Sequence, residues 1–298
     1  MCGRVALASR DAVKACAGVD RELTSPTPLE RDGEWARAGG RNASPGCAIA
    51  AVRIAAVEAD DDGASARLAR ATVGDRRACA IEDVVWGVRF DSRRGGNFER
   101  SFNARVEGLL GGDESTFAAK LAKTVNGRCV VYVDGFYEWR EEGPKGAKTR
   151  VKQPYMVRRA DGKPLALASV LTPEKARSDA VDDFPRREAA VITMPSAGGE
   201  LAWLHDRQPL FLWNDRDFDE WLFGDWARMA RERRAKDVKG LLQWHPVTTK
   251  INHAAYDGED ASAPVKRAVE KDAGSVAALF AAATKKRKVD DETAVQID

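Results

Sequence analysis

The sequence predicts an α+β protein with a mixed or barrel-like β-sheet at its core and helices at its periphery. Many short apolar, β-branched segments recur along the chain, interleaved with only a few stretches of helical period. The chain has 298 residues, of which 44% are hydrophobic. This length and composition are sufficient to bury one large core.

The strongest strand signal is RCVVYVDGFYEW at residues 128–139, a β-branched and aromatic run that is apolar on both faces, as a buried central strand should be. An alternating apolar segment at 47–57 follows the turn-rich stretch 33–46 and precedes a predicted hairpin turn at 58–66. Residues 141–152 form a predicted exposed turn. Further strands are expected at 153–159, 164–171, 188–194 and 209–213.

Three segments have a helical pattern, at 113–125, 218–236 and 262–283. The third is interrupted by Gly274. We expect one domain over residues 2–283. The remaining stretch, 284–298, has no helix or strand period and is predicted to be a disordered tail.

The predicted tail carries an unbroken basic run from Lys285 to Lys288, followed by Val289 and then by polar and acidic residues. KKRKV resembles a one-part nuclear import signal, so we expect a nuclear protein whose tail can dock replication-fork proteins. The alternative interpretation is a solvated basic end of the preceding helix, where cations are favoured.

Composition excludes several classes of protein. The net charge of +2 comes from 48 basic and 46 acidic residues, so binding to nucleic acid would need a local basic patch. Five cysteines without a CxxC pair and three histidines without ligand spacing predict no disulfide framework, no metal and no other cofactor. Because no signal peptide and no apolar run of about 20 residues is found, we expect a soluble, monomeric intracellular protein without a membrane partner.

The chain opens with MCGR, which places a cysteine directly after the initiator methionine. A second residue as small as Cys2 normally allows Met1 to be removed. The mature chain would then begin with a 1,2-aminothiol, a group whose chemistry no internal cysteine has.

A carboxylate within the strongest strand also needs an explanation. Glu138 stands among Phe136, Tyr137 and Trp139, against strand propensity and against the cost of burying a charge. One interpretation is an edge position or a salt bridge to an arginine such as Arg128. The other is a carboxyl group whose apolar setting lets it give and take protons near neutral pH.

Two further motifs carry polar groups suited to a site. His205 lies in WLHDRQP, although a lone histidine is more often structural. FNARVEG places Asn103 and Arg105 two residues apart, on one face of an extended segment. An arginine can fork to a phosphate and an asparagine offers a donor and an acceptor, whereas the alternative is a turn Asn with a solvated Arg.

Taken in order, MCGR, RNASPG, WGVRF, FNARVEG, RCVVYVDGFYEW, LHDRQPLFL and WHPV resemble the SRAP family, named for SOS-response-associated peptidase. The resemblance covers residues 2–255. The family's nuclear members process abasic sites and bind 5-hydroxymethylcytosine. The resemblance therefore implies the SRAP fold and a sensor of abasic sites in single-stranded DNA that shields the lesion during DNA repair.

The resemblance also implies roles for particular residues. Cys2 matches the family's nucleophile, and Asn103, Glu138 and His205 match its active-site residues. The matches to family residues near the DNA are Arg4, Arg105 and Arg207 at the backbone and Asn42 at the pocket floor.

Two tryptophans and one segment complete this comparison. Trp86 and Trp139 are candidates for stacking on bases, although we favour a core position for both. After WG the family continues toward a P-x-W element, which is missing here. Arg89, Arg93 and Arg94 occupy that segment instead and could contact phosphates.

The residues and the resemblance together predict a reaction. The α-amine of a mature Cys2 would form an imine with the open-chain aldehyde of an abasic site, and its thiol would close a thiazolidine ring. Glu138 would shuttle protons, His205 would protonate the ring-opened sugar oxygen and Asn103 would hold the sugar. The product is a DNA–protein crosslink, and lyase activity is a possible accompaniment.

Two other classes of function use the same residues. An N-terminal-nucleophile cysteine peptidase that processes itself would also need a thiol, a carboxylate and a histidine. A reader of modified bases would bind DNA without forming a bond.

Overall fold

The computed structural model describes residues 3–20, 22, 40–55, 76–91, 98–111, 116–143, 151–173 and 187–265. The chain up to Pro264 forms one compact unit. Several predictions fall outside the described residues: the positions of Met1, Cys2, Arg93 and Arg94, the hairpin turn at 58–66 and the tail at 284–298. The domain boundary at residue 283 likewise stays a prediction.

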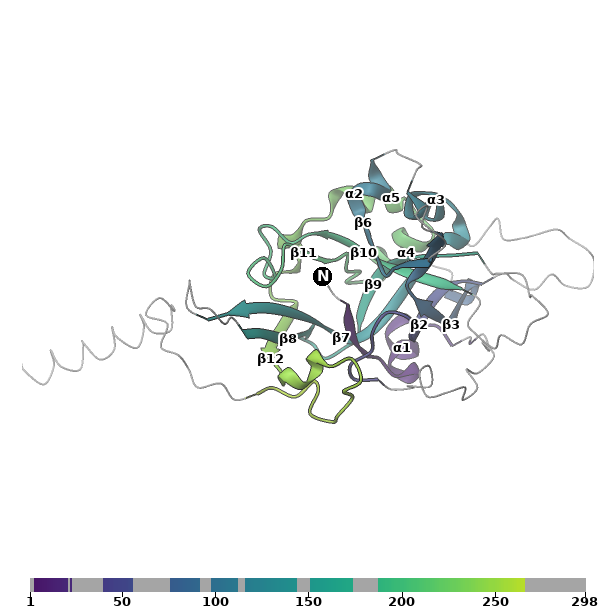
Figure 1. The fold of residues 1–298 in the computed structure, drawn as a ribbon. Coiled ribbons are helices and arrows are strands. Elements are labelled where there is room, and N and C mark those ends of the chain that lie inside the picture. Colours follow the sequence, from purple (N-terminus) through teal and green to yellow (C-terminus); the bar gives the residue numbers. More distant parts are fainter. Residues whose placement is uncertain are drawn as a thin grey trace, which may run out of the picture. The chain divides into compact units, whose positions relative to one another are not determined.

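A ten-stranded mixed sheet forms the core of this unit (Figure 1). Its strands are β1 (Arg4–Leu7), β2 (Ala48–Ile54), β3 (Cys79–Trp86), β6 (Asn103–Arg105), β7 (Arg128–Glu142), β8 (Val151–Arg159), β9 (Leu165–Leu171), β10 (Glu188–Pro195), β11 (Arg207–Pro209) and β12 (Leu242–Pro246). A separate two-stranded sheet pairs β4 (Val88–Asp91) with β5 (Phe98–Ser101).

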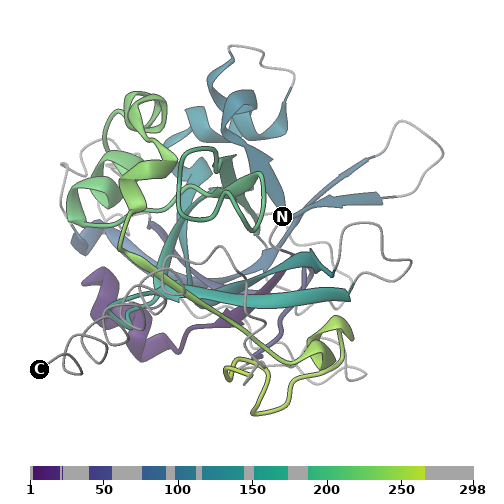
Figure 2. The ribbon, with the colours of Figure 1, turned by 90° about the vertical axis from the view of Figure 1, so that its left-hand side faces the viewer.

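Strand β7 lies at the centre, as its apolar sequence predicts, and pairs antiparallel with β1, β2, β8 and β9. Strand β10 is parallel to β3 and β6 but antiparallel to β9 and β11, which makes the sheet mixed. Because β9 pairs with both β7 and β10, the sheet curves round on itself. Strands β8 and β12 continue the sheet beyond β7 (Figure 2). The predicted mixed α+β fold is confirmed, and the sheet is not a closed barrel.

The helices pack on one face of the sheet. They are α1 (Arg10–Ala17), α2 (Val106–Leu110), α3 (Phe117–Lys123), α4 (Asp215–Leu222) and α5 (Trp226–Glu232), with short 3₁₀ turns at Arg76–Ala78, Val125–Gly127, Ala235–Val238 and Thr249–Asn252. Their apolar side chains join Val130 and Tyr132 of β7 in a helix-side core. Val131, Trp86 and Phe136 belong to a second cluster on the opposite face, which we call the site-side core.

One predicted helix and one predicted strand differ from the structure. The helix expected at 218–236 is divided into α4 and α5, because the chain turns at Gly224 and the Asp225 side chain accepts a hydrogen bond from Arg228 N at 2.9 Å to begin α5. The strand expected at 209–213 is also wrong. Only Pro209 belongs to β11, and Phe211 forms an isolated bridge to Leu167.

Other elements are shorter than expected or were missed. The helix predicted at 113–125 is α3, which begins after its cap Thr116. Of the helix predicted at 262–283, the described residues reach Val265 and are not helical. Sequence reasoning missed β1, α1, β3, β4, β5, α2 and β12, whose short or half-polar segments lack a long apolar run.

Arg128 at the start of β7 is buried and does not pair with Glu138. Its guanidinium donates to the carbonyls of Trp221 and Leu222 at the end of α4 and to those of Ala122 and Thr124 at the end of α3. Burial lowers the pKa of this guanidinium to about 10. Arg128 therefore links two helix C-termini to the central strand. The predicted salt bridge between Glu138 and Arg128 is wrong.

Replacing Arg128 with Met should lower the free energy of unfolding by about 3 kcal/mol, because buried carbonyls at two helix ends lose their donor. Urea denaturation monitored by circular dichroism measures this change. Arg231→Met, at an exposed position on α5, is the matched control and should change stability by no more than about 0.5 kcal/mol. Equal, small losses in both variants would contradict this role.

Candidate active site

Strand β1 brings the N-terminal segment of the chain onto the central strand. Arg4 lies opposite Tyr137 in the antiparallel β1–β7 pair, so the preceding residue, Gly3, comes level with Glu138. A Cβ atom built on Gly3 would lie 3.7 Å from the ring of Phe102, which leads into β6. Gly3 therefore lies next to two segments that the sequence predicts to form the site, the one with Glu138 and the one with Asn103.

Glu138 is buried, with 6% of its surface exposed. It lies opposite Tyr155 of β8, and alternation along β7 places it on the same face as Phe136, which belongs to the site-side core. Its Oε1 accepts a hydrogen bond from Trp139 N at 3.3 Å. The carboxyl group is thus buried beside the site-side core, and its role in proton transfer stays a prediction.

Asn103 reaches the same face from another strand. It begins β6 and lies opposite Val191 of β10 in parallel register. Val191 belongs to the site-side core, whereas Ala104 belongs to the helix-side core. Alternation therefore directs the Asn103 side chain toward the face that carries Glu138.

His205 lies in the loop that connects β10 to β11. Leu204, the residue before it, is part of the site-side core. Trp203 packs edge-to-face against Tyr155, with ring centroids 5.0 Å apart, and so joins this loop to the strand opposite Glu138. The segments of Asn103, Glu138 and His205 thus all border the site-side core.

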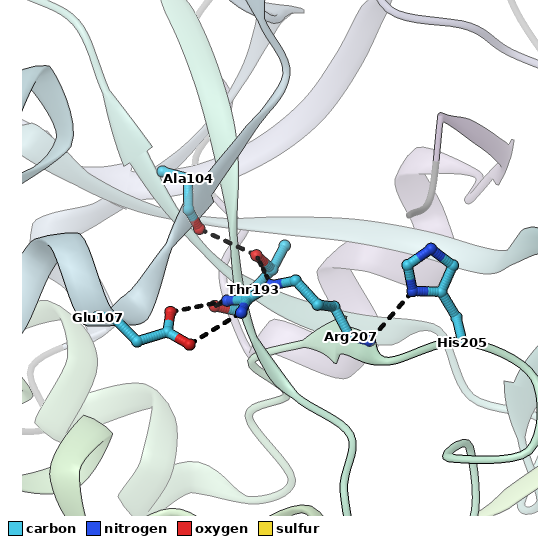
Figure 3. A network of polar contacts seen from close by, with 5 residues as sticks. All are labelled: Ala104, Glu107, Thr193, His205 and Arg207. Carbon is cyan, nitrogen blue, oxygen red and sulfur yellow. Dashed lines mark hydrogen bonds and ion pairs between the residues drawn. The ribbon is translucent and has the colours of Figure 1, made fainter.

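Arg207 and Glu107 form a two-pronged ion pair beside this histidine (Figure 3). Arg207 Nη1 and Nη2 each donate to a Glu107 carboxylate oxygen at 2.8 Å. Arg207 also donates to Thr193, from Nη2 to its carbonyl at 2.8 Å and from Nε to Oγ1 at 3.3 Å. Sequence reasoning missed Glu107 and Thr193, although FNARVEG contains Glu107 four residues after Asn103. The phosphate contact expected of Arg207 stays a prediction.

Arg4 and Asn42 are joined to each other. Arg4 Nη1 donates to Asn42 Oδ1 and to the carbonyl of Ile251, both at 2.9 Å. Asn42 is 4% exposed, and its Nδ2 donates to three carbonyls in the turn that follows β12, those of Ile251, His253 and Tyr256. These contacts fix the start of β1, and the role of Asn42 at the floor of the site stays a prediction.

The two candidate tryptophans differ in setting. Trp86 is fully buried, and its indole Nε1 donates to the Phe102 carbonyl at 3.1 Å, so it is a core residue of the segment that leads to Asn103. Trp139 is half-buried; its Nε1 donates to Asn252 Oδ1 at 2.6 Å, and the Arg4 guanidinium lies 5.9 Å from its ring centroid. A stacking role for Trp139 stays a prediction.

The remaining basic candidates lie at the edges of this region. Arg105 is exposed at the end of β6, directly before α2. Arg89 in β4 pairs with the buried Glu188, with Nε and Oε1 2.7 Å apart. Within the described residues, no cluster of three or more His, Cys, Asp or Glu side chains could hold a metal ion. No helix among those residues is long and apolar enough to span a bilayer.

The other cysteines have the wrong electrostatics for a nucleophile. Burial raises the pKa of Cys16, raises that of Cys47 to about 12 and raises that of Cys129 further. Cys79 is fully buried. Because the thiolate is the reactive form, these four thiols are poor nucleophiles at neutral pH. Of the five cysteines in the sequence, Cys2 is left as the candidate.

Fold and site together define an α+β protein that brings its N-terminal segment level with a buried carboxylate on the central strand of a mixed sheet. The chain belongs to the SRAP family, because the family model described as SOS response associated peptidase (SRAP) matches residues 1–254. This membership confirms the resemblance seen in the sequence.

Characterised relatives share this family. The chain is 30% identical over 168 residues to the abasic site processing protein YedK of Escherichia coli, covering 55% of this chain and 67% of YedK. It is 25% identical over 312 residues to the abasic site processing protein HMCES of Gallus gallus, covering 93% of this chain and 82% of that protein. A solved protein from Bacteroides thetaiotaomicron has the same fold, with a TM-score of 0.57 at 13% identity over 89% of this chain and all of that one.

Brief alkylation at pH 7 should label Cys2 well before the other cysteines, because its thiol adjoins the α-ammonium group once Met1 is removed, whereas burial disfavours the other thiolates. Peptide mapping by mass spectrometry after timed quenching measures the order. Labelling of Cys16 or Cys47 at the same rate would contradict this assignment.

Proposed function

We propose that this chain processes abasic sites in single-stranded DNA by forming a covalent crosslink through Cys2 after Met1 is removed. The characterised relatives are named for abasic site processing. The observation that carries the proposal is the placement of Gly3, level with Glu138 and against Phe102. Cys2 directly precedes Gly3 in the sequence.

The reaction balances without a cofactor. The α-amine adds to the aldehyde carbon of the open abasic sugar, and loss of one water gives an imine. The thiol of the same residue then adds across the C=N bond. Its sulfur bonds to carbon and its proton goes to nitrogen, which closes a five-membered thiazolidine. The second step is intramolecular and gains a large effective concentration.

The neighbouring side chains supply the proton transfers. Glu138, buried beside the first strand, is suited to take protons from the amine and to deliver them to the leaving water. His205 is suited to protonate the sugar oxygen that is released when the ring opens. Asn103 offers an amide donor and acceptor to hold the sugar in place.

The DNA on either side of the abasic site carries phosphates, so the protein needs a cationic surface to bind it. Arg105 is exposed beside Asn103 and is the best placed of the candidate arginines to contact a phosphate. Arg4 is anchored by Asn42 and contributes its charge from a partly buried position. A nuclear location and docking of replication proteins on the tail stay predictions, since they depend on residues outside the described part.

A second candidate function is supported by the description of the family itself, which includes the word peptidase. A peptidase would use the same thiol to attack a peptide carbonyl. An oligonucleotide with one abasic site separates the two functions. A protein–DNA band that survives denaturation supports crosslinking, whereas peptide cleavage without such a band supports the peptidase.

Replacing Cys2 with Ala should abolish the crosslink and leave the fold intact, because the described pairing of β1 with β7 runs from Arg4 to Leu7 and does not depend on the Cys2 side chain. Denaturing gel electrophoresis of the reaction with abasic single-stranded DNA measures the product. Cys2→Ser keeps the amine and should give only an imine, which borohydride traps. A borohydride-independent crosslink in either variant would refute the thiazolidine.

Replacing Glu138 with Gln should preserve folding and DNA affinity but slow crosslinking by about 10²- to 10⁴-fold, the range for loss of a general acid–base group. Single-turnover rates across pH should also lose one limb of the profile. A stable variant that crosslinks at the normal rate would remove Glu138 from the forward reaction. If it crosslinks normally but no longer releases DNA, Glu138 belongs to the reversal step.

A further inference from the structure

Three aromatic rings lie together on the site-side face of the sheet. Trp203, in the loop between β10 and β11, packs edge-to-face against Tyr155 of β8, with ring centroids 5.0 Å apart. The ring centroid of Trp244 in β12 lies 5.9 Å from that of Trp203. Both tryptophans are half-buried at the border of the site-side core. Part of each indole therefore stays open to solvent.

These rings adjoin two segments of the proposed site. Tyr155 lies opposite Glu138 in the pairing of β8 with β7, and Trp203 comes two residues before His205. The loop that carries Trp203 closes on itself, because the Ser196 hydroxyl donates to the His205 carbonyl. Trp203 and Glu138 thus flank the same tyrosine, and a base close to an abasic sugar at Glu138 can reach the Trp203 ring.

Arg140 adds a positive charge to this surface. It follows Glu138 by two residues on β7, so alternation places both side chains on one face. Arg140 is exposed, and its guanidinium carbon lies 5.0 Å from the centroid of the Trp203 ring. Within the described residues, no carboxylate forms an ion pair with Arg140. Its charge is therefore available to a phosphate.

A second arginine–tryptophan pair on this chain has a different setting. The Arg159 guanidinium carbon lies 5.3 Å from the centroid of the Trp213 ring. Arg159 Nε and Nη2, however, donate to the two carboxylate oxygens of Asp161 at 2.9 and 2.7 Å, which cancels the charge. The Arg159 side chain is only 14% exposed, and the indole nitrogen of Trp213 is buried. This second pair is a packing contact, whereas Trp203 and Arg140 form an open, cationic aromatic surface.

We propose that Trp203 and Arg140 bind a nucleotide near the lesion, with its base stacked on the Trp203 ring and a phosphate on Arg140. Single-stranded DNA fits this surface because an unpaired base offers its face to an aromatic ring. A cation–π contact at an exposed site is weaker than the stacking of a base on such a ring, so the base can displace the guanidinium. The inference deepens the proposed function, on which it rests for the position of the lesion at Glu138.

The first experiment measures binding to DNA that cannot crosslink. The full-length protein is titrated with a fluorescent single strand that carries one tetrahydrofuran residue, an abasic analogue without an aldehyde. A second strand also lacks the bases on both sides of that residue. The wild type should bind the first strand more tightly by about fivefold to hundredfold, the range for stacking of one base. Equal affinities for the two strands would overturn the inference.

The second experiment assigns this preference to Trp203. Trp203→Leu should lose the preference, because leucine keeps an apolar cover over Tyr155 but has no aromatic face. Trp203→Phe should restore most of it. Circular dichroism checks that each variant is folded. A folded Trp203→Leu that keeps the wild-type preference, or that binds both strands more weakly by the same factor, would overturn the inference, since the latter result is that of a purely structural residue.

The third experiment tests the phosphate contact at an exposed position, where folding is not at risk. Arg140→Gln should lower the slope of log affinity against log salt concentration by about 0.7, the value for one phosphate of a single strand. Trp203→Leu should leave this slope unchanged. An unchanged slope for Arg140→Gln would overturn the inference, and this measurement decides it if Trp203→Leu does not fold.

The matched control is Trp213→Leu, which removes the tryptophan that lies under the neutralised Arg159. This variant should keep both the preference for the first strand and the salt slope, and loss of the preference here as well would overturn the inference. An aldehyde-bearing strand separates the two proposals. A wild type that shows the preference but does not crosslink refutes the proposed function alone, whereas one that crosslinks but binds both strands equally refutes this inference alone.

Discussion

The pairing of β1 with β7 is the constraint on which the site depends. It places the residue that follows Cys2 level with Glu138 on the central strand of the sheet. An N-terminus is ordinarily among the most mobile parts of a chain, and a strand in a sheet is one of the few ways to fix it. The chemistry proposed here needs a terminal amine and a thiol on one residue, and β1 holds the residues that follow it beside Glu138.

The surrounding contacts strengthen that constraint. Val5 and Ala43 exchange both backbone hydrogen bonds, and Asn42 joins Arg4 to the turn after β12. The Tyr137 hydroxyl of β7 donates to the Arg41 carbonyl of that same segment at 2.6 Å. Segments from the start, the middle and the end of the described chain therefore meet at the same place.

The sequence predicted the parts of this arrangement that are strongly periodic or chemically unusual. The apolar run of β7 identified the central strand, and the carboxylate within it identified Glu138. Pairing was harder to predict, because β1 has only four residues and draws its stability from its partner. The break between α4 and α5 was missed because the apolar spacing continues through Gly224. The sequence also could not show that Glu107 meets Arg207, since a hundred residues separate them and only the fold brings them together.

The central claim is that both the amine and the thiol of Cys2 bond to one carbon of the lesion. Mass spectrometry of the nuclease-treated crosslink tests it most directly. The account predicts that the modified peptide begins at Cys2, lacks Met1, has gained the sugar fragment less one water, and no longer reacts with a thiol reagent. A modified peptide whose cysteine still reacts with that reagent, or a sugar fragment attached at an internal lysine or cysteine, would contradict the account.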